Sequence, residues 1–521
     1  MTKLTFYGAL GRIGGNKILL EDKKGNKTTR LWLDFGKDFV QFNKYFSEFA
    51  QPQKCRGITD FIKTNQLPKL PGLYRPDFVQ KSGHKVKKVS YDGVLLSHAH
   101  FDHASEISHI HPQIPIYSTL ETKVILQALQ ESGTYQYGDF VVFREYYSRS
   151  RKNREVVERP FEIFKPGEVK KIGGLKVESW PVDHSLPGAC GYIIHTSSGP
   201  LVYTGDFRFH GHKSDSTERF FERAQEVKPK LMLCEGTNID ERPGRTEAQV
   251  GDEVSEAIKS TKGMVLADFP VRDLDRLNSF YTAAVKNNRK LAINLKQAYL
   301  LKLMWESGCN ASPALNMEAK DFMEAFRPGL VVFAPKKKMG NITEHDVSLE
   351  EKLKDYSGWE REFIAHDVGT KGKPKMLENA FCVHANHIRN NQEQYVVAIS
   401  PFSIQGLNDL KPKKDSLYIY SKVEPFNDEM KMDYQGLKSW LDLYGLREVH
   451  IHCSGHAFGE QIGSAIARVN PGILIPIHTE HPELFEARIK EADKGYKGRV
   501  EVLGFDSEKN MNGRARVVFE V

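Results

Sequence analysis

The sequence predicts an α/β protein with at least two domains, and three observations support this prediction. Short apolar runs rich in β-branched residues alternate with longer helical patterns. Several runs end in a polar residue, as buried strands do when they deliver side chains to one edge of a sheet; examples are 31–35, 93–97, 201–206, 231–235 and 396–400. The length of 521 residues exceeds what one compact core usually holds. An α/β class with two domains fits all three.

The alternation is most regular from about residue 236 to residue 450. Apolar runs at 264–269, 290–295, 329–333, 394–400 and 416–421 enclose helical patterns such as 271–287 and 296–307. This order predicts a doubly wound parallel sheet. The strands E-V-H-I-H and I-L-I-P-I-H and a helix near 482–493 are then expected to complete the first domain. The predicted domains are therefore 1–215 together with 451–521, and 216–450 between them.

The composition is that of an ordinary globular protein, with 40% hydrophobic and 27% charged residues. No apolar run reaches the roughly 20 residues that cross a bilayer. The start of the chain has neither the apolar core nor the cleavage site of a secretory signal, so we expect a cytoplasmic protein without a membrane partner. Six scattered cysteines without a C-x-x-C pair predict neither disulfides nor a cysteine-based zinc site. The net charge of +7 fits a polyanionic partner without requiring one.

Residues 97–103, S-H-A-H-F-D-H, bring three histidines and an aspartate into one short segment. His98 and His100 are two residues apart, so both imidazoles can face one side at the end of a strand. Asp102 and His103 follow at once, and one short loop wraps four ligands around a single small ion only with strain. Two neighbouring metals are therefore predicted. Histidine and carboxylate ligands without thiolate suit zinc, with manganese or iron as competitors.

Three further candidate ligands stand where strands are predicted to end: His184, Asp206 and His478. With the motif they complete two coordination spheres, which are His98, His100 and His184 for one metal, Asp102, His103 and His478 for the other, and Asp206 bridging them. A pair of metals at such a site can activate water and stabilise charge on a phosphoryl oxygen.

This order of motifs resembles the metallo-β-lactamase superfamily, for which H-x-H-x-D-H is a specific signature. The resemblance covers residues 1 to about 215 and 450 to 521. It implies an αββα sandwich, and it makes Asp34 in L-W-L-D-F-G the buried aspartate that steadies the metal loop. It does not select the reaction, because hydrolysis of lactams, thioesters and phosphodiesters all occur on this scaffold.

The long segment between Asp206 and His456 is similar to the β-CASP insertion of the nucleases in this superfamily. Glu235 resembles its acidic motif A, His456 in S-G-H-A its motif B, and His478 its motif C. Cleavage of a phosphodiester expels a 3′-oxyanion, which needs a proton donor or a stabilising charge. His456 is the candidate for either role, with Glu235 holding its tautomer and raising its pKa. The alternative is a core histidine behind the loop.

The candidate catalytic residues are therefore Asp102, Glu235 and His456, while His452 on the same strand as His456 is expected to support the ligands. The stretch G-A-L-G-R-I-G-G-N at 8–16 does not have G-x-G-x-x-G spacing, and a tight glycine turn is the better interpretation.

Within the β-CASP group, S-G-H-A and the T-N after Glu235 look most like ribonuclease J, and the short segment after His478 is similar to its archaeal form. The resemblance implies a ribonuclease that binds single-stranded RNA and two divalent ions, zinc before manganese. It implies 5′-phosphate products, 5′-to-3′ exonuclease action with endonuclease activity, and compatibility with a homodimer. Motif A departs from the pattern, since Glu235 stands where aspartate is usual, and T-E follows motif C where G-E is usual.

Three alternatives stay open. The glutamate of motif A is similar to that of the mRNA 3′-end processing endonucleases, so a strictly endonucleolytic enzyme is one. A DNA nuclease of the Artemis type is another, and an inactive RNA-binding subunit is the third. An exonuclease acting at a 5′-monophosphate also needs a pocket of hydroxyls and amides. The candidates for it are Thr237, Asn238, Ser454 and Gly455, although such groups at strand ends are usually capping or turn residues.

Overall fold

The computed structural model describes the chain except for residues 48, 134, 148–153, 310–311, 344–347, 369–381, 426–427 and 505–515. The chain forms two compact units, of which the first combines Met1–Pro243 with Gly455–Val521 and the second is Gly244–Ser454. The units divide after Pro243 and after Ser454, whereas the sequence predicted boundaries after residues 215 and 450. The first unit extends further because it keeps α6 (Ser214–Glu226) and β13 (Leu231–Glu235), which pack onto its own sheet.

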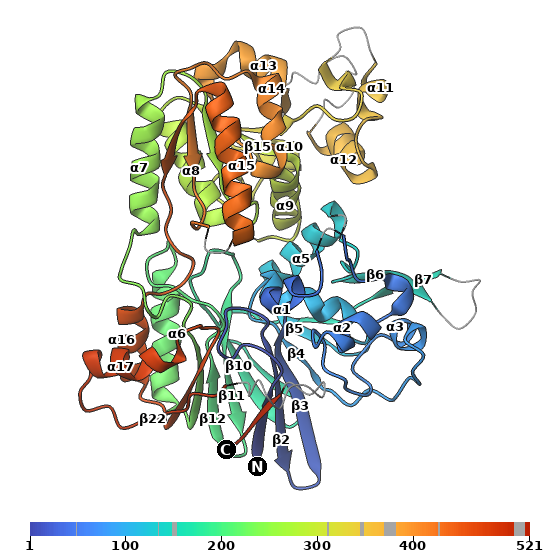
Figure 1. Ribbon diagram of the computed structural model, residues 1–521, viewed down its shortest axis with the longest axis vertical. Helices are drawn as coiled ribbons and strands as arrows, with labels where there is room; N and C mark the ends of the chain where they lie inside the picture. The colour runs from blue at the N-terminus through green and yellow to red at the C-terminus, as the bar shows by residue number, and fades with distance from the viewer. Residues whose placement is uncertain are drawn as a thin grey trace. The chain divides into compact units, whose positions relative to one another are not determined.

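Two seven-stranded sheets form the centre of the first unit (Figure 1). The first sheet has the order β23 (Val517–Glu520), β1 (Thr2–Phe6), β2 (Lys17–Lys24), β3 (Lys27–Phe35), β4 (Gly93–Leu95), β5 (Ile116–Ser118) and β8 (Phe161–Ile163). The second has the order β22 (Arg499–Val500), β21 (Ile473–Ile477), β13, β12 (Gly199–Tyr203), β11 (Cys190–Thr196), β10 (Leu175–Pro181) and β9 (Val169–Ile172). A separate hairpin pairs β6 (Val142–Tyr147) with β7 (Arg154–Glu158).

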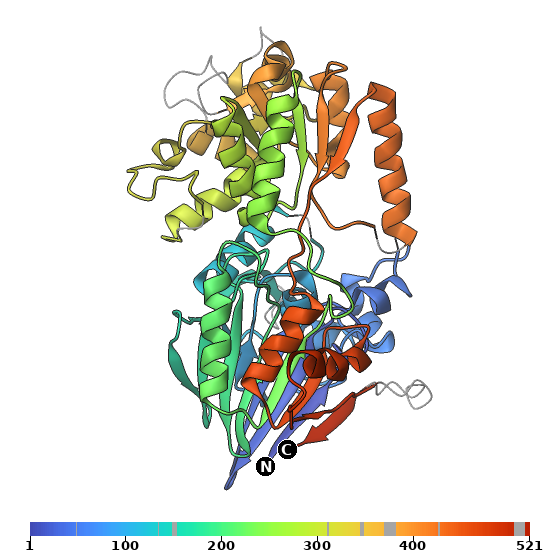
Figure 2. The same cartoon turned by 90° about the vertical axis from the view of Figure 1, so that its left-hand side faces the viewer.

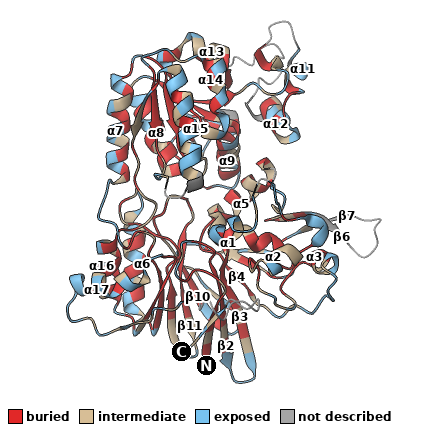
Figure 3. Cartoon of the chain, in the orientation of Figure 1, coloured by how far each residue is buried: buried red, intermediate tan, exposed pale blue. Residues whose placement is uncertain are grey.

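The alternation of side chains along a strand places each sheet between two layers. On β11, Tyr192 and Ile194 pack into the core between the two sheets, while Ile193 faces the helices. Those helices are α6, α16 (Gly459–Val469) and α17 (Phe485–Ala492), which lie together on one face in Figure 2. The helices on the other side of the sandwich are α1 (Phe39–Asn43), α2 (Thr59–Lys63), α3 (Pro76–Lys81), α4 (Phe101–Ala104) and α5 (Leu120–Ser132) (Figure 1). The central strands of the two sheets, such as β4 and β11, are buried over most of their length (Figure 3). The layers form the αββα sandwich that the sequence predicted.

The second unit is built on one parallel sheet. Its order is β17 (Cys382–His384), β16 (Leu330–Ala334), β15 (Lys290–Asn294), β18 (Tyr395–Ala398), β14 (Val265–Asp268), β19 (Leu417–Tyr420) and β20 (Arg447–His450). All of its described strand pairs are parallel. The helices that connect them are α7 (Glu247–Ser260), α8 (Leu274–Lys286), α9 (Leu295–Glu306), α10 (Phe322–Ala325), α11 (Leu349–Leu353), α12 (Gly358–Glu362), α13 (Ala385–Asn390), α14 (Leu407–Leu410) and α15 (Asp428–Tyr444). This is the predicted doubly wound domain, inserted in the sandwich.

One predicted strand belongs to the other unit. The run E-V-H-I-H was expected to help complete the first domain, but β20 pairs with β19 in the inserted sheet. The run I-L-I-P-I-H does return to the first unit, where β21 pairs with β13. The local pattern of a strand is the same in either sheet, so the sequence alone could not assign it.

Two sets of parallel strands direct their carboxyl ends to the same region of the first unit. In the second sheet β12, β13 and β21 are adjacent and parallel, and in the first sheet β3 and β4 are. Polar residues that follow these strands therefore meet at one edge, as in other open α/β sheets. None of the helices in the described part of the chain combines the length and the apolar composition that crossing a bilayer requires.

Candidate metal centre

The S-H-A-H-F-D-H segment leaves β4 and turns directly into α4. His100 is the last residue in extended conformation, and the backbone N–H groups of His103 and Ala104 donate to its carbonyl. The change from strand to helix points His98 and His100 to one side and places Asp102 and His103 on the first turn. His98 and His103 are completely buried, whereas His100 and Asp102 are partly exposed.

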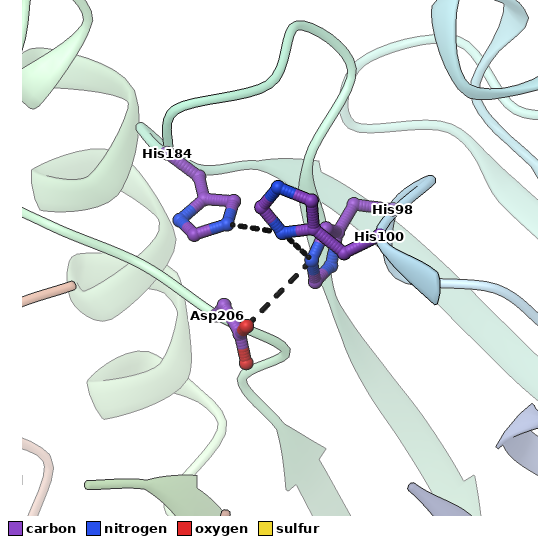
Figure 4. Close-up of side chains that lie close together, drawn as sticks. All are labelled: His98, His100, His184 and Asp206. Atoms are coloured by element: carbon purple, nitrogen blue, oxygen red, sulfur yellow. Dashed lines mark hydrogen bonds and ion pairs between the residues drawn. The ribbon is translucent and has the colours of Figure 1, made fainter. Parts of the chain in front are cut away.

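The first group of candidate ligands is His98, His100, His184 and Asp206 (Figure 4). His100 Nδ1 lies 3.0 Å from Nε2 of His98 and 3.1 Å from Nε2 of His184. His184 comes from the loop between β10 and β11, and Asp206 follows β12. The Oδ2 atom of Asp206 is 3.6 Å from Nε2 of His98.

The second group is Asp102, His103 and His478. Oδ2 of Asp102 is 3.1 Å from Nε2 of His478 and 3.7 Å from Nε2 of His103. Asp206 borders this group as well, because its Oδ2 lies 3.1 Å from Nε2 of His103 and 3.9 Å from Nε2 of His478. The same carboxylate oxygen thus faces both groups.

These separations fit divalent ions. Ligand atoms at the corners of a tetrahedron around an ion, each about 2.0–2.1 Å from it, are roughly 3.3 Å apart. The distances within each group scatter around that value. Oδ1 of Asp206 is buried and has no hydrogen-bond partner among the described residues, which leaves a charged oxygen available as a ligand. Together with the fold, the two groups indicate a site for divalent metal.

The far nitrogen of each buried imidazole is held by an oxygen atom, as in other metal-binding histidines. His184 Nδ1 donates to the carbonyl of Gly455 at 2.6 Å, and His103 Nδ1 donates to Oδ2 of Asp34 at 2.7 Å. The hydroxyls of Thr237 and Ser97 lie 2.9 Å and 3.0 Å from Nδ1 of His478 and His98 respectively. The carbonyl of Gly455 and the carboxylate of Asp34 can only accept, so Nδ1 of His184 and of His103 carries a proton and Nε2 of each faces the centre.

Asp34 sits behind the motif at the end of β3 and is completely buried. Its carboxylate accepts from the Ser97 N–H and hydroxyl, both at 2.7 Å, and from the Tyr203 hydroxyl at 2.5 Å. With the His103 contact, one carboxylate joins β3 and β12 to the metal loop. The sequence pointed to Asp34 but gave no sign of Ser97 or Tyr203.

The glycine stretch at 8–16 forms the wall beside the second group. The carbonyl of Ala9 accepts from the backbone N–H of His478 at 2.7 Å, and the Asn16 N–H donates to the carbonyl of Asp102 at 3.0 Å. A Cβ on Gly14 would lie 2.9 Å from Cβ of Asp102. The Nδ2 atom of Asn16 is 3.1 Å from Nδ1 of His103. The turn predicted here therefore positions two candidate ligands, and the glycine density was the only signal of it.

Glu235 and His456 form a pair next to both groups. His456 Nδ1 is 3.0 Å from Oε1 of Glu235, and the carboxylate also accepts from the backbone N–H groups of Phe207 and Thr237. These two residues, with Asp206 and His478, are also close enough to bind an ion. The contacts of Glu235 with His456 and with two N–H groups favour a hydrogen-bonding role instead.

The histidines of the site differ in the direction in which their pKa is shifted. Burial lowers the pKa of His98 and of His184 well below the usual value, so both imidazoles are neutral at physiological pH. Burial also opposes protonation of His456, but Glu235 outweighs it and raises the pKa of His456 to about 9. Burial likewise opposes ionisation of Asp102, yet the nearby His103 holds the pKa of that carboxyl below its usual range. Burial also opposes protonation of His103, but Asp206, Asp102 and Asp34 outweigh it and raise the pKa of His103 well above the usual value. The centre thus combines two histidines with lowered pKa, His98 and His184, and two with raised pKa, His103 and His456.

The residues suggested for a 5′-phosphate pocket have other contacts. Thr237 and Gly455 hold His478 and His184, as described above, and the side-chain amide of Asn238 donates to the carbonyl of His456 at 3.2 Å. These three therefore support histidines. Ser454 is the last residue of the second unit. His452 also belongs to that unit, where its Nδ1 lies 3.1 Å from Nη1 of Arg276, because the strand before it joined the inserted sheet.

The chain is similar to known proteins in both sequence and fold. The profile of the beta-lactamase superfamily domain matches residues 71–262. Ribonuclease J of Sinorhizobium meliloti is 22% identical over 80% of this chain and 62% of that protein. Ribonuclease J of Pyrococcus abyssi is 22% identical over 79% of each chain. A crystal structure of a protein of unknown function from Enterococcus faecalis V583 is 21% identical, with a TM-score of 0.66 over 99% of this chain and 100% of that one. The chain spans about 57 to 62% of the length of the first bacterial relatives.

Proposed function

We propose that this chain, a ribonuclease J-like protein of the metallo-β-lactamase superfamily, is a metal-dependent ribonuclease that hydrolyses RNA phosphodiesters to 5′-phosphate products. One observation carries the proposal: the two ligand groups share a carboxylate oxygen of Asp206, and the His456–Glu235 pair lies beside them. That arrangement combines a site for two cations with a group that can donate a proton.

Two divalent ions would be held by His98, His100 and His184 on one side and by Asp102, His103 and His478 on the other, with Asp206 between them. When bound, they supply a nucleophilic water and stabilise charge on the phosphoryl oxygens. The nitrogen and carboxylate donor set, without a thiolate, favours zinc, with manganese as the second candidate. His98 and His184 suit this role because burial keeps them neutral.

Two residues of the chain, His456 and Glu235, can supply the proton that the leaving 3′-oxygen needs. Glu235 accepts from Nδ1 of His456, so Nε2 of the imidazolium is the atom that would donate a proton to the departing 3′-oxygen. The raised pKa keeps His456 protonated at neutral pH. The two backbone N–H groups on the Glu235 carboxylate fix its orientation, and through it that of the imidazole.

The similarity to ribonuclease J supports single-stranded RNA as the substrate and 5′-to-3′ exonuclease action with endonuclease activity, in RNA decay or processing in the cytoplasm. The second candidate is a strictly endonucleolytic processing enzyme. Glu235 as motif A favours it, and the contacts of Thr237, Asn238 and Gly455 remove three groups from the proposed 5′-phosphate pocket.

The test uses RNA and matched DNA of one sequence, labelled at either end, with a 5′-monophosphate or a 5′-triphosphate. The proposal expects RNA cleavage, with mononucleotides released from the monophosphorylated 5′ end. Internal fragments from both kinds of RNA would favour the endonuclease, and cleavage of DNA alone would contradict a ribonuclease.

Two variants and a metal measurement complete the test. D102A/H103A should lose cleavage and fall below the two ions per chain that we expect in the parent by elemental analysis. H456Q should cleave about 10²–10⁴-fold more slowly with its metal retained. If D102A/H103A binds RNA as the parent does, and neither turns it over, the chain is an inactive RNA-binding subunit.

A further inference from the structure

A short helix next to the metal loop exposes a group of apolar side chains. They belong to α1 and the residues after it, and we call them the α1 aromatic surface: Phe39, Val40, Tyr45 and Phe49. Their exposed fractions are 43%, 63%, 46% and 98% respectively. Single exposed apolar residues are common, but four within eleven positions mark a surface that contacts something.

The helix is anchored, so the exposure does not come from a loose end. Asp38 caps α1 by accepting from the Gln41 N–H at 2.9 Å, and the Gln41 side chain donates to the carbonyl of Thr64 at 2.7 Å. On the inner side the rings of Phe42 and Phe46 lie 4.8 Å apart, and Phe46 lies 6.3 Å from the buried Phe61. The inward aromatic residues hold the segment while the outward ones face solvent.

Cationic side chains accompany the exposed rings. The Lys37 ammonium lies 3.0 Å from the ring centre of Phe42 and 5.5 Å from that of Phe39. The Lys44 ammonium lies 5.7 Å from the ring centre of Tyr45. The nearby acid Asp38 is already paired with Arg12, at 2.7 Å. Lys37 lies over the inward ring of Phe42, and burial lowers its pKa to about 8, so the exposed charge beside these rings is that of Lys44. An exposed ring next to an exposed lysine is the combination that stacks bases and contacts phosphates in single-stranded nucleic-acid sites.

The backbone connects this surface to the candidate metal centre. The Lys37 N–H donates to the carbonyl of Phe101 at 2.9 Å, and the Gly36 N–H donates to the carbonyl of Asn16, whose own N–H bonds Asp102. A Cβ on Gly36 would lie 1.9 Å from the Asp102 carbonyl. Phe39 is three residues further on, so its Cα lies within roughly 10 Å of Gly36 even for an extended chain. The surface therefore begins a few residues from a candidate ligand.

We propose that the α1 aromatic surface binds the single-stranded RNA substrate beside the metal centre, with Phe39 and Tyr45 stacking on bases and Lys44 contacting phosphates. The proposal rests on the proposed function and specifies where the strand outside the scissile bond is held. The exposed Lys44 charge and the connection to Asp102 favour RNA over a second copy of the chain, which an apolar face alone would fit equally well.

The test measures binding of a fluorescein-labelled 12-nucleotide oligouridylate with phosphorothioate linkages, which resist hydrolysis, by fluorescence anisotropy. F39L/Y45L keeps apolar bulk and removes the aromatic faces, and we expect its affinity to fall by at least about tenfold. F39W should bind as the parent does. V169A, which alters an equally exposed apolar residue on β9, is the matched control and should change nothing.

Two further readouts identify the cause. An oligomer of the same length without bases should bind F39L/Y45L and the parent equally, because only stacking is lost. K44Q should weaken binding and reduce the slope of log affinity against log salt by about one. Unchanged metal content and unfolding temperature in F39L/Y45L would confirm that the variant is folded.

The outcomes separate this inference from the proposed function. Parent-like RNA binding by F39L/Y45L, in a protein that does cleave RNA, overturns the role of the surface alone. Aromatic-dependent binding in a protein that cleaves no RNA overturns the nuclease and keeps the surface. If light scattering shows a parental dimer that F39L/Y45L converts to a monomer, with RNA binding unchanged, the surface is an interface between copies and the proposal is wrong.

Discussion

Asp183 and Arg208 form an ion pair inside the first unit, with 3.1 Å between Oδ1 and Nε and both side chains completely buried. The Arg208 N–H also donates to the carbonyl of Asp183 at 2.8 Å. Asp183 precedes the candidate ligand His184, and Arg208 follows Asp206 by two residues. The pair therefore fixes the distance between two loops that supply one metal group, without contributing a ligand itself.

Replacing Arg208 should loosen that group. R208M removes the guanidinium that pairs with the buried Asp183 carboxylate, and breaking such a pair costs about 3–5 kcal/mol. We expect a lower free energy of unfolding in urea and weaker retention of one of two metal ions during dialysis against a chelator. The double variant D183N/R208M should recover part of the stability, because it also removes the buried negative charge. Equal stability of the single variant and the parent would contradict a linking role.

Replacing Asp34 tests the support of His103. In D34N the amide cannot serve at once as acceptor for His103, Ser97 and Tyr203, so the tautomer of His103 is no longer fixed. Loss of such a contact typically lowers metal affinity 10–100-fold, measurable by competition with a chromophoric chelator. D22N is the matched control, since Asp22 is also buried in the first unit but bonds Thr2 and Ser197. Similar losses in both variants would point to general destabilisation.

Gly36 tests the close approach of the backbone to the metal loop. A Cβ at this position would lie 1.9 Å from both C and O of Asp102, and backbone atoms cannot move aside cheaply. G36A should therefore displace the loop and lower cleavage and metal content together. G436A serves as the control, because a Cβ on Gly436 meets nothing within 4 Å and alanine favours its helix. Parental metal content in G36A would show that the loop tolerates the shift.

A pH dependence of stability is expected from Glu178, away from the metal centre. Burial opposes its ionisation, but hydrogen bonds from Arg223, His195 and Trp180 lower the pKa of Glu178 to about 2. A folded-state pKa below the unfolded value near 4.3 stabilises the fold fully above about pH 5, and this contribution is lost as the pH falls toward 2. The difference in unfolding free energy between the parent and E178Q should be constant above pH 5 and shrink below it. A difference that grows on acidification would contradict the sign.

Much of the architecture was predictable because strand ends carry their own signals. The apolar runs that end in Asp34, Asp206 and Glu235 marked buried strands, and parallel neighbours bring such ends to one edge. The seven candidate ligands, far apart in the sequence, do lie together, and their role as metal ligands remains a prediction that the variants test.

What the sequence did not predict depends on contacts between distant backbone atoms. Nothing local shows that Ala9 accepts from His478, that Gly455 accepts from His184, or that Asp183 pairs with Arg208. The assignment of β20 failed for a related reason, since periodicity describes a strand and not the neighbour it pairs with. The residue type alone does not show whether a hydroxyl or an amide binds a ligand or orients a histidine. Thr237 and Asn238 were predicted to bind a phosphate, but in the structure they contact histidines.

The contact of His478 with Ala9 joins a residue near the start of the chain to one 469 positions later. A growing polypeptide that has emerged as far as the inserted unit carries His98, His100 and His184 but neither His456 nor His478. The second group of candidate ligands and the proposed proton donor are therefore incomplete until ribosomal synthesis has passed these positions. The proposed nuclease site can form only after His478 has been synthesised.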